Sequence, residues 1–260
     1  MHTHILQLDI TWEDKQANYA TVREMIEGAP IATGDLIVLP ELFDVGFTLN
    51  TKIACDTDNS TLTFLQELAD ATQCTIHGSR AIKSPDPDKA YNCATICKPN
   101  QSSPACEYYK VHPFSFGREA DSYLGGDRIT QYRWTAGEQS LSICPAVCYD
   151  LRFPELFRLG AKRGAQAFVF GASWPIARMH HWRSLSIARA IENQAFVIAA
   201  NRTGNDPYLQ YNGGSLVINP KGEVLGELND EQAVLSVEID PQIAVDWRST
   251  FPALNDIKLV

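Results

Sequence analysis

Three reactive side chains stand at the ends of apolar runs in the sequence. Glu41 follows LIVLP, Lys110 ends ACEYYK, and Cys148 follows SLSICPAV. A carboxylate can take the proton of a thiol, and an ammonium stabilises the negative charge that the thiol then carries. Because ligand crevices in α/β sheets form at strand ends, we expect the three side chains to share one pocket and perform nucleophilic catalysis.

Each of the three residues, taken alone, has a simpler interpretation. A cysteine in an apolar run is ordinarily a small core residue. Glu41 alone would be a solvated loop acid, and Lys110 alone would be a surface lysine. Their equivalent positions at strand ends favour a joint chemical role, which these separate interpretations do not explain.

The segment ICPAVCYDLRFPE places Cys148 between a strand and a helix. The apolar run 141–147 is typical of a buried strand, and the pattern after it predicts a helix that begins at Pro154 and ends at Gly164. The thiol therefore lies at an elbow with a rigid backbone. We expect the backbone N–H of Tyr149 to face a bound oxyanion there.

Length and composition indicate one globular domain over residues 1–260, with a C-terminal tail at about 241–260. The 260 residues are 45% hydrophobic and 20% charged, without a linker-like or repetitive segment. The net charge of −9 and the lack of a basic stripe argue against nucleic acid and membrane as partners. The N-terminus does not resemble a signal peptide and no apolar run approaches membrane-spanning length, so we expect a cytoplasmic protein.

The protein has seven cysteines, an odd number that predicts free thiols in a reducing compartment. Two pairs, Cys93/Cys97 and Cys144/Cys148, share a CxxxC spacing. Zinc sites more often use CxxC, so this spacing favours no metal site.

Hydrophobic periodicity and turn signals predict helices that alternate with buried strands. Helices are expected at 11–28, 60–73, 154–164 and 180–194, the last with Trp182, Leu185, Ala188 and Ile191 along one side. Strands are expected at 3–10, 36–40, 75–82, 89–98, 105–110, 131–134, 140–147, 166–172, 195–201, 215–220 and 233–240, the last two joined by the turn KGEV. Strand hairpins interrupt the alternation, so an α/β fold of two packed mixed sheets with outer helices fits better than one doubly wound sheet.

Three motifs resemble those of a known enzyme superfamily. VLPELFDVGFT, YYKVHPF and CPAVCYDLRFPELFR resemble the glutamate, lysine and cysteine motifs of the nitrilase superfamily of carbon–nitrogen hydrolases, in the expected order. GASWPIARMHHWRSLSIARAIENQAFVIAANRTG resembles the omega-amidase branch, whose members hydrolyse the terminal amide of 2-oxoglutaramate and related acids. The resemblance implies an α-β-β-α four-layer sandwich that pairs into a homodimer.

The resemblance also implies a role for each motif residue. Cys148 would be the nucleophile, Glu41 the general base and Lys110 the oxyanion support, while Glu119 in FGREADSY best matches a second glutamate of the family. Attack on the amide would form a thioester, with Glu41 first protonating the departing ammonia and then activating water. Lys110 and the N–H of Tyr149 would stabilise the oxyanion. This chemistry needs no metal or organic cofactor.

An omega-amidase substrate carries a carboxylate remote from its amide, and an arginine can bind that carboxylate with two hydrogen bonds. Arg118, Arg178 and Arg202 stand near the expected pocket rim. Arg178 is the first candidate, because its loop follows a strand expected close to that of the cysteine. Trp174 and Phe116 are further candidates for substrate binding.

The partner and the reaction leave alternatives open. Phe153, Leu156 and Phe157 offer an apolar face for the homodimer, although the same residues suit an ordinary core. The protein is an omega-amidase, another superfamily member such as a nitrilase, carbamoylase or aliphatic amidase, or a binding protein that kept the fold. The intact Glu-Lys-Cys set argues against the binding protein, and ammonia release from small amides separates the other two.

Overall fold

The first sheet is mixed, with parallel strands at its centre and antiparallel strands on both sides. The computed structural model describes residues 1–259, and the order in this sheet is β15-β1-β2-β3-β4-β5, with β6 beside β4. The bounds are β1 His2–Gln7, β2 Leu36–Val38, β3 Thr75–Lys83, β4 Ala90–Cys97, β5 Cys106–Tyr109, β6 Tyr123–Leu124 and β15 Ala233–Glu238. β2 is apolar throughout because both of its faces are covered.

The second sheet has the same mixed character, with β8, β9 and β10 parallel at its centre. Its order is β14-β13-β10-β9-β8-β7. The bounds are β7 Tyr132–Ala136, β8 Gln139–Val147, β9 Ala167–Ala172, β10 Phe196–Asn201, β13 Leu216–Ile218 and β14 Val224–Glu227. A separate hairpin pairs β11 Thr203–Asn205 with β12 Gln210–Asn212.

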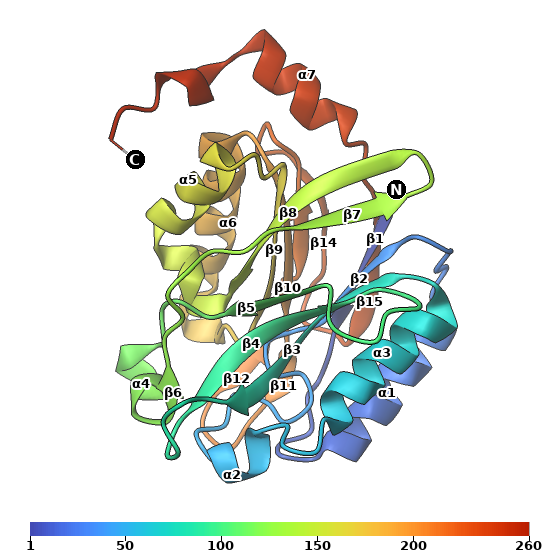
Figure 1. Ribbon diagram of the computed structural model, residues 1–260, viewed down its shortest axis with the longest axis vertical. Helices are drawn as coiled ribbons and strands as arrows, with labels where there is room; N and C mark the ends of the chain where they lie inside the picture. The colour runs from blue at the N-terminus through green and yellow to red at the C-terminus, as the bar shows by residue number, and fades with distance from the viewer. Residues whose placement is uncertain (260) are drawn as a thin grey trace.

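Helices cover the outer face of each sheet (Figure 1). α1 (Lys15–Glu27) and α3 (Ser60–Thr72) lie on the first sheet, and α5 (Pro154–Lys162) and α6 (Met179–Asn193) lie on the second. The remaining helical segments are α2 Thr51–Ala54, α4 Glu119–Ser122 and α7 Gln242–Thr250, with the 3-10 turns η1 Ser115–Gly117, η2 Cys148–Arg152, η3 Ile176–Arg178 and η4 Ala253–Asp256.

Buried apolar side chains fill three layers, one between the two sheets and one between each sheet and its outer helices. Trp134 and Phe196 belong to the layer between the two sheets, Phe64 to the layer beneath α1 and α3, and Phe157 and Trp182 to the layer beneath α5 and α6. The predicted α-β-β-α sandwich of two mixed sheets is therefore confirmed.

The two sheets approach each other closely at Gly171 in β9. A Cβ atom added there would lie 2.6 Å from the carbonyl oxygen of Leu39 and 2.7 Å from the backbone nitrogen of Glu41. Glycine is required at this point because the backbone that follows β2 passes directly over it.

Two local predictions are wrong. The side of α6 that faces the sheet carries Trp182, Ser186, Arg189 and Ala190, whereas Ile191 is 52% exposed. The prediction failed because two of the buried positions, Ser186 and Arg189, are polar. Arg189 can be buried because it donates hydrogen bonds to the carbonyl oxygen of Leu151. The turn KGEV also does not join the two last strands, since it leads into β14, and the backbone then crosses to the first sheet as β15.

The helix after the elbow does not offer the expected dimer face. Leu156 is 3% and Phe157 0% exposed, because both pack within the protein against the second sheet. They contribute to the ordinary core, and the homodimer remains a prediction without this support. The tail, for which no element was predicted, contains α7, and Arg248 there donates hydrogen bonds to the carbonyl oxygens of Ala165, Asn193 and Gln194.

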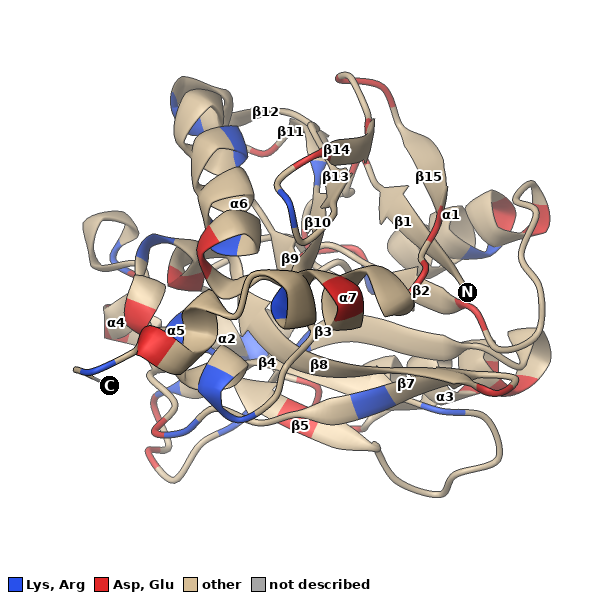
Figure 2. Cartoon of the chain, turned by 90° about the horizontal axis from the view of Figure 1, so that it is seen from above, with Lys and Arg blue, Asp and Glu red and all other residues tan. Residues whose placement is uncertain are grey.

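Charged residues of both signs are interspersed on the outer helices α5, α6 and α7 (Figure 2). In the part of the protein that the structure describes, no helix has both the length and the apolar composition needed to cross a bilayer.

Candidate active site

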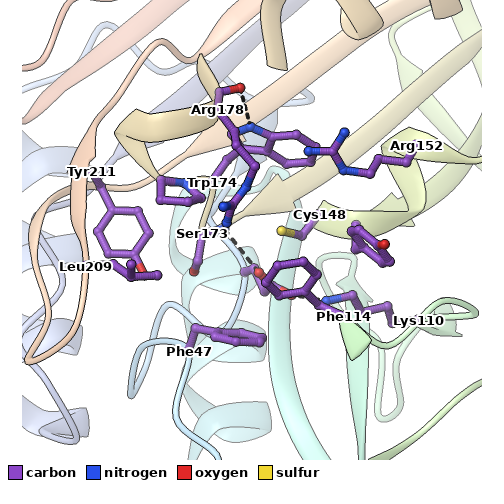
Figure 3. Close-up of a pocket in the computed structure, with 13 residues that line it drawn as sticks. Phe47, Lys110, Phe114, Cys148, Arg152, Ser173, Trp174, Arg178, Leu209 and Tyr211 are labelled. Carbon is purple, nitrogen blue, oxygen red and sulfur yellow. Dashed lines mark hydrogen bonds and ion pairs between the residues drawn. The ribbon is translucent and has the colours of Figure 1, made fainter. Parts of the chain in front are cut away.

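Three strand ends from two sheets meet at one cavity (Figure 3). Glu41 follows β2, Lys110 follows β5, and Cys148 follows β8, and all three side chains line the cavity. With Ser173 after β9 they form what we call the inner wall. Counted with its open mouth, the cavity holds about 410 Å³ of empty space.

Lys110 stands between two buried glutamates. Its Nζ donates to Glu41 Oε1 at 2.7 Å and to Glu119 Oε1 and Oε2 at 3.0 and 2.8 Å. Burial alone would lower the pKa of Lys110, but the charges of Glu119 and Glu41 raise it well above its ordinary value. Lys110 is therefore a permanent cation inside the cavity.

Glu41 is fixed by hydrogen bonds from both sheets. Its Oε1 also accepts from Asn92 Nδ2 at 2.8 Å, and its Oε2 accepts from the backbone N–H of Ser173 at 3.1 Å. Asn92 Nδ2 reaches Glu119 Oε1 at 3.1 Å as well. The sequence did not single out Asn92, although a carboxamide in the otherwise apolar run of β4 was a usable signal.

Glu119 contacts Lys110 from outside the lining of the cavity. It is fully buried, and the backbone N–H of Phe114 donates to its Oε2 at 2.5 Å. Burial raises the pKa of Glu119, although Lys110 acts in the opposite direction. Glu119 does not line the cavity, and it contacts the lining through its hydrogen bonds with Lys110 and with Asn92, which also holds Glu41.

Cys148 occupies the expected elbow between β8 and η2. Its φ of 44° is unusual for a residue other than glycine, and such strain is typical of nucleophile elbows. Asp150, which the sequence also missed, holds the turn because it accepts from the backbone N–H groups of Val147 and His112 and from the hydroxyl of Tyr108. Tyr149, the second residue of η2, has its N–H in the first turn, where intrahelical acceptors are missing.

The surroundings of Cys148 favour the neutral form of its thiol. Burial and the charge of Glu41 raise the pKa of Cys148 well above its ordinary value, although Lys110 lowers it. Glu41 is thus the carboxylate in position to receive the thiol proton. Among the described residues, no three His, Cys, Asp or Glu side chains gather as a metal site.

Loops supply the opposite side of the cavity, which we call the outer wall: Phe47, Phe114, Trp174, Arg178, Leu209 and Tyr211. Trp174 is held by Asn201, whose side chain bonds the backbone N–H and carbonyl of Trp174 at 2.8 and 3.0 Å. The guanidinium of Arg178 lies 5.4 Å from the ring centre of Phe114 and forms no ion pair with any residue in 1–259. Arg152 also lines the cavity, with its guanidinium 4.7 Å from the ring centre of Trp174.

The structure does not bring the other candidates to the cavity. Arg202 is buried elsewhere and donates to the carbonyl oxygens of Ile10, Thr203 and Asn205. Arg118 is exposed and pairs with Asp121. Phe116 is 83% exposed and lines a neighbouring groove rather than this cavity, so its part in substrate binding stays a prediction. The 3-10 turn η1 directs it outward, and Phe114 lines the cavity instead.

The protein is similar to carbon–nitrogen hydrolases in sequence and in structure. Residues 4–249 match the model of the carbon-nitrogen hydrolase family. The sequence is 34% identical to an omega-amidase of Yersinia enterocolitica, covering 97% of this chain and 94% of that protein. It is also 34% identical to a 2-oxoglutaramate amidase of Bacillus subtilis, covering 97% and 96%. A CN-hydrolase superfamily protein of Xanthomonas campestris superposes with a TM-score of 0.91 at 31% identity, covering 100% of this chain and 98% of that one.

Proposed function

The chain belongs to the carbon–nitrogen hydrolases of the nitrilase superfamily, and from this we propose that it hydrolyses the terminal amide of small omega-amido dicarboxylates. Representative substrates are 2-oxoglutaramate and succinamate. The observation that carries the proposal is that two guanidiniums, those of Arg152 and Arg178, line the cavity of Cys148 without an acidic partner in residues 1–259, and we assign the carboxylate to Arg178. A cation in that position suits a substrate with a carboxylate at one end and an amide at the other.

In the first half of the proposed reaction, the thiol of Cys148 attacks the amide carbonyl while Glu41 takes its proton. The carbonyl oxygen becomes an oxyanion, which Lys110 and the N–H of Tyr149 stabilise. One such donor contributes about 3 kcal/mol to the transition state. Glu41 then donates the proton to the leaving ammonia, and an acyl thioester remains on Cys148.

In the second half, water replaces ammonia in the position beside Glu41. Glu41 removes a proton from this water, which attacks the thioester. The carbon–sulfur bond then breaks, and Glu41 returns the proton to the sulfur, so that the acid and the free thiol are released. Asn92 and the N–H of Ser173 keep the carboxylate of Glu41 in place through both halves. Glu119 holds Lys110 at the oxyanion without touching the substrate.

The proposal is tested by ammonia release from succinamate, 2-oxoglutaramate and the neutral amide butyramide. We expect kcat/KM for the two charged amides to exceed that for butyramide by roughly 100-fold, because a charge-assisted pair contributes about 1.5–3 kcal/mol. A preference for butyramide would contradict the omega-amidase assignment and favour an aliphatic amidase.

A further inference from the structure

A second, apolar depression opens directly beside the cavity, and the proposed reaction does not use it. This outer groove holds about 1040 Å³ of empty space, and Trp12, Leu49, Phe116 and Tyr208 contribute to its lining. Phe116 is 83% and Tyr208 79% exposed. Large apolar side chains gathered in the open beside a pocket indicate a ligand surface.

The outer groove and the cavity share a rim. Phe47, Phe114, Arg178 and Leu209 line both of them. A carboxylate held by Arg178 therefore lies at the boundary, with the reacting amide on the cavity side of it. Any further substituent on the substrate carbon that carries this carboxylate therefore lies beside the groove.

The chemistry of the groove suits an uncharged, apolar group. Its acid, Asp206, is already engaged, because it accepts from the backbone N–H groups of Tyr208 and Leu209 and from the hydroxyl of Tyr211. Trp12 and Tyr208 make an edge contact at 5.9 Å between ring centres, which leaves an aromatic surface for stacking.

We propose that the outer groove binds an apolar or aromatic substituent next to the substrate carboxylate, so that N-acylated glutamines with large acyl groups are substrates. This inference rests on the proposed function, since Arg178 must hold the carboxylate. Water cleaves the carbon–nitrogen bond of the terminal carboxamide by the same two steps. The products are ammonia and the N-acylglutamate, and the acyl group itself does not react.

The test compares N-benzoyl-L-glutamine with N-acetyl-L-glutamine, which differ only in the size of the acyl group. We expect the wild type to favour the benzoyl compound by about tenfold in kcat/KM, because the phenyl ring loses contact with water in the groove. Tyr208→Ser and Phe116→Ser should each lower this ratio towards one, mainly through KM. The control Phe251→Ser removes a 55% exposed aromatic outside the groove and should keep the ratio.

A wild-type ratio near one overturns the inference, as does a ratio that both groove variants leave unchanged. Variants that change the molecular mass in light scattering but not the ratio overturn it too, and assign the groove to contact between copies. Succinamate is measured alongside. If succinamate is hydrolysed and neither glutamine is, the groove inference fails alone, whereas failure of all three amides removes the proposed function with it.

Discussion

The inner and outer walls of the cavity are built in different ways. Residues of the inner wall stand at or within three residues of the ends of β2, β5, β8 and β9 and are at most 9% exposed, and Glu41 is hydrogen-bonded to both Lys110 and Ser173. Residues of the outer wall come from loops, from η3 and from the hairpin of β11 and β12, and their exposure ranges from 3% for Trp174 to 42% for Leu209. The sheets thus fix the reacting groups, while loops that tolerate change face the rest of the substrate.

Each wall therefore controls a different property of the reaction. A displaced group on the inner wall affects the chemical steps, because proton transfer and oxyanion stabilisation depend on exact geometry. A changed side chain on the outer wall affects the choice of substrate. Substitutions should therefore separate into effects on kcat and effects on KM, according to the wall.

The largest effect is expected for Cys148→Ala, which should lower turnover of succinamate to less than about 1% because no other group can form the thioester. Cys144→Ala provides the matched control. Cys144 lies four residues earlier, fully buried inside β8, and burial raises its pKa to about 12. Its loss should leave most activity. Circular dichroism checks that both variants are folded, and substantial turnover by Cys148→Ala would remove the mechanism.

The two glutamates that bind Lys110 should differ next most strongly. Glu41→Gln removes the proton acceptor and should block acylation, lowering its rate by about 10²–10⁴-fold. Glu119→Gln keeps that acceptor and only weakens the support of Lys110, so a reactive amide should still modify Cys148 slowly. Mass spectrometry of the covalent adduct distinguishes the two. Equal adduct formation would mean that the glutamates share one role.

On the outer wall, Arg178→Met should raise KM for succinamate by roughly 100-fold, because a charge-assisted pair contributes about 1.5–3 kcal/mol. The value for butyramide should change little, since that amide has no carboxylate. Steady-state kinetics on both substrates provides the measurement. Parallel losses on the charged and neutral amides would show that Arg178 does not bind the carboxylate.

The smallest effect concerns Asp44, in the loop that joins Glu41 to Phe47 and thus the two walls. Burial raises the pKa of Asp44 from 3.8 to about 6, opposed by Lys15. A raised carboxyl pKa penalises the folded state above that pKa, and the penalty is relieved as the pH falls through 6. From pH 7.5 to 5, wild type should gain roughly 1 kcal/mol of unfolding free energy relative to Asp44→Asn. Urea unfolding of both proteins at the two pH values measures this difference, and its absence would mean that Asp44 is not strained.

The sequence predicts the inner wall far better than the outer one. Glu41, Lys110 and Cys148 could be located because a largely apolar run marks each strand and its end. Asn92 was missed because its role depends on a partner in another strand, and pairing across a sheet leaves no local pattern. Phe114, which lines the cavity, was not singled out because the 3-10 turn η1 that follows it has no clear period.

The loop from 206 to 211 was unpredictable for a similar reason. Its shape depends on the carboxylate of Asp206, which accepts hydrogen bonds from the backbone N–H groups of Tyr208 and Leu209 and from the hydroxyl of Tyr211. Only the folded hairpin brings these groups together. The face of α6 was mispredicted at Ile191 because buried Ser186 and Arg189 are polar. Hydrophobic periodicity cannot identify a buried position whose hydrogen bonds are satisfied by the rest of the fold.

The close approach at Gly171 brings the two sheets together at the active site. The active site is therefore complete only when both sheets are folded and docked. Glu41, Asn92 and Lys110 come from one sheet and Cys148 and Ser173 from the other, so neither half of the fold alone can catalyse the reaction. During refolding, strands and helices can form before the halves meet, and a protein at that stage would be structured but inert. The rate at which ammonia release recovers during refolding would therefore report how fast the two sheets dock. Any larger side chain at position 171 would delay or prevent this docking.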